Sequence, residues 1–251
     1  MNITKKQVLK IGISYASYSE VLEYITKGLK NNTKKRYIVT PNPELLMLAH
    51  SNNRYKSVLN RADLALPDGV GVMWAAKILG KPLKERIAGV GMVEKLCKEV
   101  SKKPITVGFL GGRQNVAVKT AECLQKKYPE LKVAYVGGEW MEGEVKSKNS
   151  KFKSSEKKNI NPSIDILFVA FGSPKQELWI ADNLEKLPVK VAIGVGGAFD
   201  FISGRIKRAP IWVQNLGFEW LYRLIRQPWR IKRQARLIMF AYLVLRQKFL
   251  N

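Results

Sequence analysis

The sequence has few of the residues that build disulfides and zinc sites. Its 251 residues include two cysteines, Cys97 and Cys123, and a single histidine, His50. The cysteines do not form a CxxC pair, so neither a disulfide framework nor a Cys/His zinc site has support. We therefore expect a chain that works in the reducing cytoplasm.

Long apolar runs are also absent. The longest uncharged apolar stretch near the C-terminus is residues 237–245, whereas a helix that spans a bilayer needs about 20 such residues. The first 19 residues are interrupted by Lys5, Lys6 and Lys10 and lack the apolar core of a secretory signal. Any membrane contact should then be peripheral, on the inner leaflet of the cell membrane.

Acidic residues are outnumbered, with 20 Asp and Glu against 44 Lys and Arg, which gives a net charge of +24. Such a charge favours nucleic acid, anionic lipid or phosphorylated small molecules as partners. Residues 205–251 carry eleven of the basic residues, one acid and eight aromatics. They predict an amphipathic helical segment, broken or kinked at Pro228, that contacts an anionic membrane surface. The alternative is a solvated basic helix packed on its own domain.

Short apolar runs alternate with helical periodicity along the rest of the chain. The predicted strands are residues 37–40, 64–66, 105–110, 132–136, 164–171 and 189–195. The predicted helices lie near residues 44–60, 70–79, 92–100, 114–127 and 175–187. This rhythm predicts an α/β fold with a mostly parallel, Rossmann-like sheet sandwiched by helices. We expect a core of residues 1–204, a C-terminal appendage of residues 205–251, and a Lys/Ser-rich surface insertion at residues 143–161.

Candidate chemistry lies where the predicted strands end. Ligands of open parallel sheets gather at the carboxyl ends of strands, where the first turns of helices offer unpaired N–H groups. Five polar loops lie at such strand ends: residues 40–44, 66–71, 111–113, 171–177 and 194–200. None contains the dinucleotide or P-loop fingerprint. The glycines of these turns, Gly111 and Gly197 among them, can also be explained by backbone geometry alone.

Several residues of these loops have two readings. Asp68 either caps the following helix or acts as a general base. Arg86 is either a surface charge or a clamp for a diphosphate, and Gln176 is either a first-turn helix residue or a substrate contact. Asp200 either caps a turn or accepts hydrogen bonds from a nucleobase.

The motifs TPNPE at 40–44, LPDGVG at 66–71, ERIAG at 85–89, GSPKQE at 172–177 and GVGGAFD at 194–200 occur in the order found in one known family. In this series the chain resembles the WecG/TagA/CpsF glycosyltransferases, the TagA type most of all. The likeness extends through RAP at 208–210 and EWLYR at 219–223. It is weakest at residues 137–144 and in the insertion that follows.

The resemblance implies an inverting transferase that moves N-acetylmannosamine from UDP-ManNAc to undecaprenyl-diphosphate-GlcNAc, a step toward wall teichoic acid. Within the family, a uronic acid or another hexose is the alternative donor sugar. The resemblance implies catalytic roles for Asp68 as base, for Thr40 beside it, and for Arg223, Arg230 and Arg233. It implies substrate-binding roles for Asn42, Arg86, Gln176, Asp200, Gly111 and Gly197.

No Asp-x-Asp pair for a metal ion occurs in the sequence, and arginines could neutralise a departing diphosphate instead. We therefore expect an enzyme without a cofactor or metal. Two hypotheses from other classes are a basic nucleic-acid-binding protein and a non-catalytic membrane scaffold. The nucleic-acid hypothesis leaves the strand-end motifs unexplained, so we expect no nucleic-acid partner. A homo-oligomer is left open.

Overall fold

The structure is a computed structural model that describes residues 2–31, 34–113, 115–138, 163–226, 228 and 231–250. For residues 30, 31, 215, 223, 231–235 and 250 it describes the backbone alone. The insertion expected at residues 143–161 lies outside the described residues.

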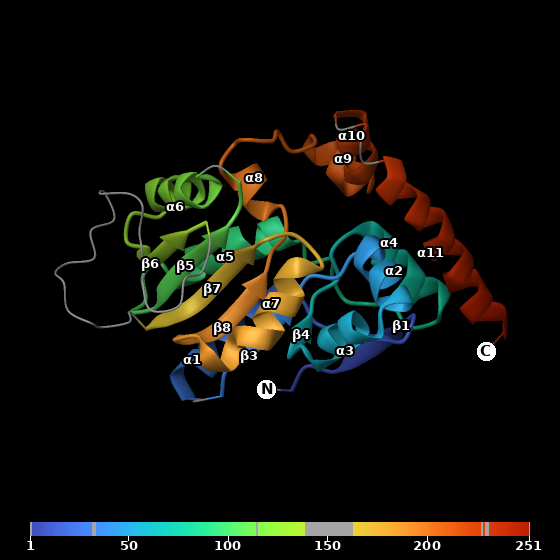
Figure 1. Cartoon of the computed structure of the whole chain (residues 1–251), viewed down its shortest axis with the longest axis horizontal. Coiled ribbons are helices and arrows are strands. Elements are labelled where there is room, and N and C mark those ends of the chain that lie inside the picture. The colour runs from blue at the N-terminus through green and yellow to red at the C-terminus, as the bar shows by residue number, and fades with distance from the viewer. Residues whose placement is uncertain are drawn as a thin grey trace. The chain divides into compact units, whose positions relative to one another are not determined.

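Six strands form one sheet, in the order β4-β3-β8-β7-β5-β6 (Figure 1). Their bounds are β3 (Arg36–Val39), β4 (Leu64–Ala65), β5 (Thr106–Gly111), β6 (Lys132–Gly137), β7 (Ile164–Ala170) and β8 (Val189–Gly194). The pairs β3 with β8, β8 with β7, β7 with β5 and β5 with β6 are parallel. All six predicted strands are confirmed, as is the Rossmann-like α/β class.

The middle of the sheet is buried because its strands are almost wholly apolar. Strand β7 reads IDILFVA and buries every residue except Asp165, as expected for a parallel strand covered on both faces. The Phe109 and Phe168 rings of β5 and β7 stack with centroids 5.5 Å apart. These contacts fix the strands whose carboxyl ends carry several of the candidate loops.

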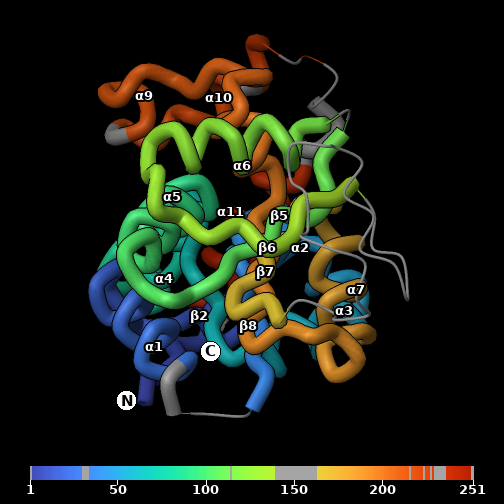
Figure 2. The backbone as a smooth tube through the Cα atoms, turned by 90° about the vertical axis from the view of Figure 1, so that its left-hand side faces the viewer, coloured from blue at the N-terminus to red at the C-terminus, as the bar shows by residue number. Residues whose placement is uncertain are grey.

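Helices connect the strands and cover the sheet. Their bounds are α1 (Tyr18–Asn31), α2 (Pro43–Ser51), α3 (Asn53–Arg61), α4 (Val70–Ile78), α5 (Gly89–Val100), α6 (Val116–Lys127), α7 (Lys175–Asn183), η1 (Leu184–Lys186) and α8 (Ala198–Ile202). Helix α6 packs on β5, β6 and α8, and Figure 2 shows α6 beside β5 and β6. A hairpin of β1 (Lys5–Val8) and β2 (Ile11–Ser14) precedes them.

The chain divides into two compact units. The first unit comprises Met1–Tyr18, Val39–Ala88 and Lys207–Asn251, and the second comprises Ser19–Ile38 and Gly89–Ile206. The C-terminal segment is thus grouped with residues from two earlier parts of the chain. A functional division between residues 1–204 and 205–251 remains a prediction.

The C-terminal segment folds as α9 (Ile211–Asn215), α10 (Glu219–Arg226) and α11 (Ile231–Leu250). The predicted break at Pro228 is confirmed, because it lies between α10 and α11. Helix α11 packs on α2 and α4 (Figure 1), and its Phe240 and Val244 are buried. No helix within the described ranges is long and apolar enough to cross a membrane.

One predicted helix is wrong in its extent. The segment near residues 44–60 forms two helices, because Asn52 adopts an extended conformation and caps α3. Its Oδ1 accepts a hydrogen bond from the backbone N–H of Tyr55 at 2.9 Å. The asparagine thus satisfies a first-turn donor that a continuous helix would have bonded to a backbone carbonyl.

Substituting this cap should have a measurable cost. We expect Asn52→Ala to lower the free energy of unfolding by about 1 kcal/mol, the usual value of such a cap. Urea denaturation would measure the change. The neighbouring Asn53→Ala is the matched control, since Asn53 is exposed in the first turn of α3. Equal stability of the two variants would contradict the capping role.

Candidate active site

Three loops of the first unit are joined to one another by backbone hydrogen bonds. They are the Thr40 loop (residues 40–43) after β3, the Asp68 loop (residues 66–71) after β4, and the Arg86 loop (residues 85–88) before α5. The bonds run from Leu66 N to Val39 O at 2.8 Å, from Asp68 N to Pro41 O at 2.9 Å and from Ile87 N to Pro67 O at 2.9 Å. Three sequence motifs thus form one connected backbone cluster.

The Asp68 loop turns sharply into α4. Gly69 is the N-cap of this helix at φ 94°, and no side-chain capping hydrogen bond is found there among the described residues. Asp68 itself is half-buried. Asp68 therefore precedes the N-cap of α4 and does not occupy it, and its role as a general base stays a prediction.

The backbone of Gly71 also lies close to the Pro43 side chain of the Thr40 loop. Gly71 follows Asp68 closely, and a Cβ placed on it would lie 2.7 Å from Cγ of Pro43 in the Thr40 loop. That distance is shorter than any ordinary carbon contact, so the approach requires glycine. The glycine of the LPDGVG motif at position 71 thus allows α4 to begin beside the Thr40 loop.

The two candidate residues of the Thr40 loop differ in environment. Thr40 is buried. Asn42 is the N-cap of α2, and its Oδ1 accepts a hydrogen bond from Leu45 N at 3.0 Å. Asn42 therefore has a structural task that the motif alone did not reveal, and its contact with a donor substrate stays a prediction.

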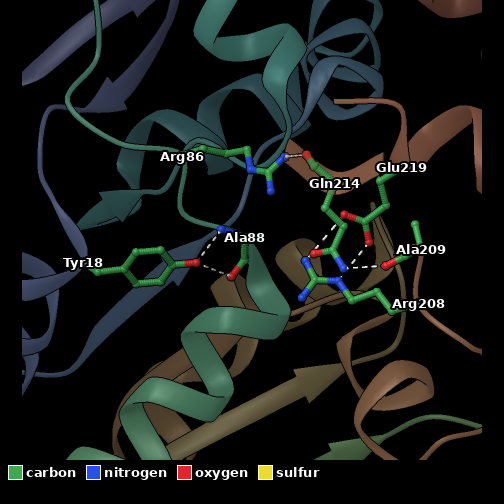
Figure 3. Close-up of polar contacts among 7 residues, drawn as sticks. All are labelled: Tyr18, Arg86, Ala88, Arg208, Ala209, Gln214 and Glu219. Carbon is green, nitrogen blue, oxygen red and sulfur yellow. Dashed lines mark hydrogen bonds and ion pairs between the residues drawn. The ribbon is translucent and has the colours of Figure 1, made fainter. Parts of the chain in front are cut away.

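Tyr18 is a neighbour of this cluster that the sequence did not single out. Its hydroxyl accepts a hydrogen bond from Ala88 N at 2.9 Å and lies 3.3 Å from Ala88 O, to which it can donate (Figure 3). Its backbone N–H donates to Glu85 Oε2 at 2.8 Å. Tyr18 therefore holds both ends of the Arg86 loop.

Electrostatics places the same tyrosine close to both candidate catalytic charges. Burial raises the pKa of Tyr18 to about 12, and the negative charges of Asp68 and Glu85 act in the same direction, while Arg86 opposes them. The phenol thus stays protonated near neutral pH and serves as a hydrogen-bonding group. Asp68 and Arg86 lie within electrostatic range of one hydroxyl.

Arg86 contacts the C-terminal segment within the first unit. Its Nη1 donates to the backbone carbonyl of Gln214, in α9, at 3.1 Å (Figure 3). Arg208 lies nearby and pairs with Glu219, with Nε 3.0 Å from Oε1. Arg86 is half-buried and oriented by a carbonyl, which argues against an ordinary solvated surface charge.

The second unit holds Gln176, which is 1% exposed. Its Oε1 accepts from Gly196 N at 3.0 Å and its Nε2 donates to Glu177 Oε1 at 2.7 Å. Ser173 Oγ donates to the same carboxylate oxygen at 2.7 Å. Gln176 thus connects the loop after β7 to the loop after β8, and its expected contact with substrate stays a prediction.

The sequence did not single out Glu177, although it ends the GSPKQE motif. Its side chain is fully buried, and it accepts hydrogen bonds from two residues of the same motif. A buried carboxylate with such partners is costly to replace. The only signal for it in the sequence is its place inside the motif.

The other candidate residues of the second unit occupy turns. Asp200, in α8, pairs with Arg205 across 3.3 Å. Gly111 ends β5 at φ 101°, and a Cβ there would lie 2.9 Å from the backbone of Ala170. Gly197 is the N-cap of α8 with φ −80°, a conformation open to other residues. Backbone geometry explains Gly111 but not Gly197.

The three arginines expected from the C-terminal segment cannot be placed against these loops. Arg230 and the side chains of Arg223 and Arg233 lie outside the described residues. Their backbones assign Arg223 to α10 and Arg233 to α11. Their catalytic role stays a prediction.

Acidic, histidine and cysteine side chains do not gather into a metal site in the described part of the chain. No group of three or more that could hold an ion is found there. Asp68, Glu85 and Arg86 all act electrostatically on the Tyr18 hydroxyl. The Glu85 carboxylate accepts a hydrogen bond from the backbone of Tyr18, and the Asp68 carboxylate and the Arg86 guanidinium are the two candidate groups for chemistry on an anionic substrate.

Comparison with known proteins agrees with this set of loops. The family described as "Glycosyl transferase WecG/TagA/CpsF family" matches residues 6–251. Three similar proteins bear the name N-acetylglucosaminyldiphosphoundecaprenol N-acetyl-beta-D-mannosaminyltransferase. One from Bacillus spizizenii is 35% identical over 87% of this chain and 82% of its own length. One from Bacillus subtilis is 32% identical over 93% and 88%, and one from Staphylococcus aureus is 30% identical over 98% and 94%. The chain therefore belongs to the WecG/TagA/CpsF family of glycosyltransferases.

Proposed function

We propose that this chain transfers N-acetylmannosamine from UDP-ManNAc to GlcNAc-diphosphoundecaprenol, with inversion at the anomeric carbon. The observation that carries the proposal is the joining of the Asp68 and Arg86 loops, which brings a carboxylate and a guanidinium into one polar cluster. The names of relatives at 30–35% identity supply the acceptor and the transferred sugar, and UDP as the carrier of that sugar is part of the proposal. Family membership leaves the nucleic-acid hypothesis without support of its own.

The proposed reaction needs one base and one stabiliser of negative charge. The Asp68 carboxylate takes the proton of the acceptor hydroxyl while that oxygen bonds to the anomeric carbon. The bond from the anomeric carbon to the diphosphate breaks, and UDP leaves with the electron pair. Arg86 holds the diphosphate through charge-assisted hydrogen bonds that strengthen as its charge grows.

A product assay tests this function directly. The protein would be incubated with a lipid-diphosphate-GlcNAc analogue and, separately, with UDP-ManNAc, its uronic acid form and other UDP-hexoses. A mass increase of one N-acetylhexosamine with UDP-ManNAc alone supports the proposal, and NMR would establish the epimer and the β linkage. Transfer of the uronic acid only would assign the chain to another branch of the family. We place the product in wall teichoic acid linkage-unit synthesis.

We expect turnover without a divalent metal, because arginine side chains can neutralise the leaving diphosphate. The rate in EDTA should stay within about twofold of the rate in Mg²⁺. An enzyme that needs the metal would instead lose several kcal/mol of transition-state stabilisation in EDTA, and its rate would fall far more than twofold. Initial rates after extensive dialysis would measure this. Loss of activity in EDTA that returns with Mg²⁺ would overturn the expectation.

We also propose that the chain docks on the inner leaflet of the cell membrane through α11. Among the described side chains of this helix, five large apolar ones are exposed, and four of them recur at spacings of four, three and four residues: Ile238, Tyr242, Leu245 and Phe249, with Met239 as the fifth. Residues so spaced follow one face of a helix. The opposite, buried residues Phe240 and Val244 show that the exposed stripe is additional to the face packed on α2 and α4.

A further inference from the structure

The segment of residues 208–219 carries a series of contacts that ends at Arg86 (Figure 3). We propose that Arg208, Glu219 and Gln214 are positioning residues, which orient the Arg86 guanidinium for the diphosphate of a UDP-sugar. The inference rests on the proposed function, because it takes Arg86 as the diphosphate ligand.

The first contact is the ion pair that flanks α9. Arg208 Nε lies 3.0 Å from Glu219 Oε1, and Arg208 Nη2 lies 3.5 Å from Glu219 Oε2. The two side chains are 27% and 26% exposed, so solvent screens this pair less than a fully exposed one. Because Arg208 precedes α9 and Glu219 begins α10, the pair fixes the two ends of a short helical loop.

The second contact lies inside that loop. Gln214 Nε2 donates to the backbone carbonyl of Ala209 at 2.6 Å, which ties the end of α9 to its beginning. The Gln214 carbonyl accepts from Gly217 N at 3.1 Å and from Arg86 Nη1 at 3.1 Å. A carbonyl in the last turn of a helix carries partial negative charge, so it is a favourable partner for a guanidinium.

The third contact joins the same loop to α4. Gly217 has φ 80°, and a Cβ placed on it would lie 2.5 Å from Val70 Cγ2. Val70 is the first residue of α4, two positions after Asp68. The loop is thus held both against the start of α4 and, through the Gln214 carbonyl, against Arg86.

These contacts give Arg86 a fixed orientation before substrate binds. A guanidinium has five N–H donors in one plane, and the Gln214 carbonyl engages Nη1 alone. This contact restricts the positions open to the guanidinium, so less side-chain freedom is lost when a diphosphate binds. Disturbing the ion pair should therefore act on donor binding, although neither Arg208 nor Glu219 need touch the substrate.

A reciprocal charge exchange tests the inference. We expect R208E and E219R each to raise the KM for UDP-ManNAc and the Kd for UDP about tenfold, comparable to losing one oriented contact of a charged group. The double variant R208E/E219R should return both values to within about threefold of wild type, since it restores an ion pair at the same place. Adding R208E to R86A should leave the Kd for UDP unchanged from that of R86A.

A matched control is the exposed pair of Lys127 and Glu94 in the second unit, 2.9 Å apart. The variant E94K should leave the KM for UDP-ManNAc and the Kd for UDP at wild-type values. Thermal unfolding of every variant would separate lost stability from altered binding. A lower melting temperature with unchanged Kd, failure of the double variant to recover, or additivity of R208E with R86A would overturn the inference.

Failure of the proposed function would be recognised separately. If the wild-type protein binds UDP but does not transfer ManNAc, the donor sugar is wrong, while the Kd for UDP still reports on the positioning of Arg86. If the wild-type protein binds no UDP, both proposals are overturned.

Discussion

Replacing Asp68 by asparagine should lower kcat by about 100- to 10,000-fold, the usual contribution of a positioned general base. Asparagine keeps the size of the side chain but cannot accept the proton of the acceptor hydroxyl. The Kd for UDP should remain within about threefold of wild type, since the base acts only on the acceptor in the transition state. Single-turnover product formation and calorimetric UDP binding would measure the two effects.

Asp63 provides the matched control for this substitution. It precedes β4, whereas Asp68 follows that strand, and its charge acts on Lys5. Asp63→Asn should leave kcat near the wild-type value. If Asp68→Asn retained more than about a tenth of the wild-type kcat, general-base catalysis by this residue would be untenable.

The position of Asp68 at the end of a strand could be predicted because each strand of the sheet has a local signal in the sequence. Apolar runs that stop at glycine, proline or asparagine located all six strands of the sheet. Parallel strands buried on both faces need such runs. The loops that follow them were thereby also located, and the motif order pointed to the family.

The N-terminal hairpin could not be predicted because its turn lacks the usual residues. Leu9 and Lys10 both have positive φ, at 49° and 64°, a conformation normally signalled by Asn-Gly or Asp-Gly. In this chain the pairing of β1 with β2 imposes the turn on residues that give no such signal. Strand β2 is also buried along its whole length, so no alternation of polar and apolar residues marks it.

The partners of the candidate site residues were beyond prediction for a different reason. Tyr18 bonds to Ala88 across 70 positions, and Arg86 bonds to Gln214 across 128 positions. A single sequence gives no measure of contacts between such distant segments. The motifs identified Arg86, but the tyrosine that holds its loop and the carbonyl that accepts from its side chain emerge only from the fold.

The exposed stripe of α11 leads to the second large expected effect, on membrane binding. Ile238 is 78% exposed and Phe249 is 80% exposed, whereas Val244 on the packed face is 2% exposed. Fully burying a side chain of this size is worth about 1.5–3 kcal/mol. Basic residues of the same helix, among them Arg246 and Lys248, would add attraction to anionic lipid.

The triple variant I238S/L245S/F249S should therefore weaken binding to vesicles containing anionic phospholipid by about 100-fold, since about 1 kcal/mol lost at each position gives that factor. Its melting temperature should stay near that of wild type, because none of the three side chains is buried. Phe240→Ser is the contrasting control: it removes a buried contact of α11, so it should lower stability while the folded protein still sediments with vesicles. Wild-type protein should bind zwitterionic vesicles more weakly than anionic ones, with the difference shrinking in high salt. If the triple variant sedimented as wild type does, α11 would not be the docking surface, and its exposed apolar stripe would need another partner.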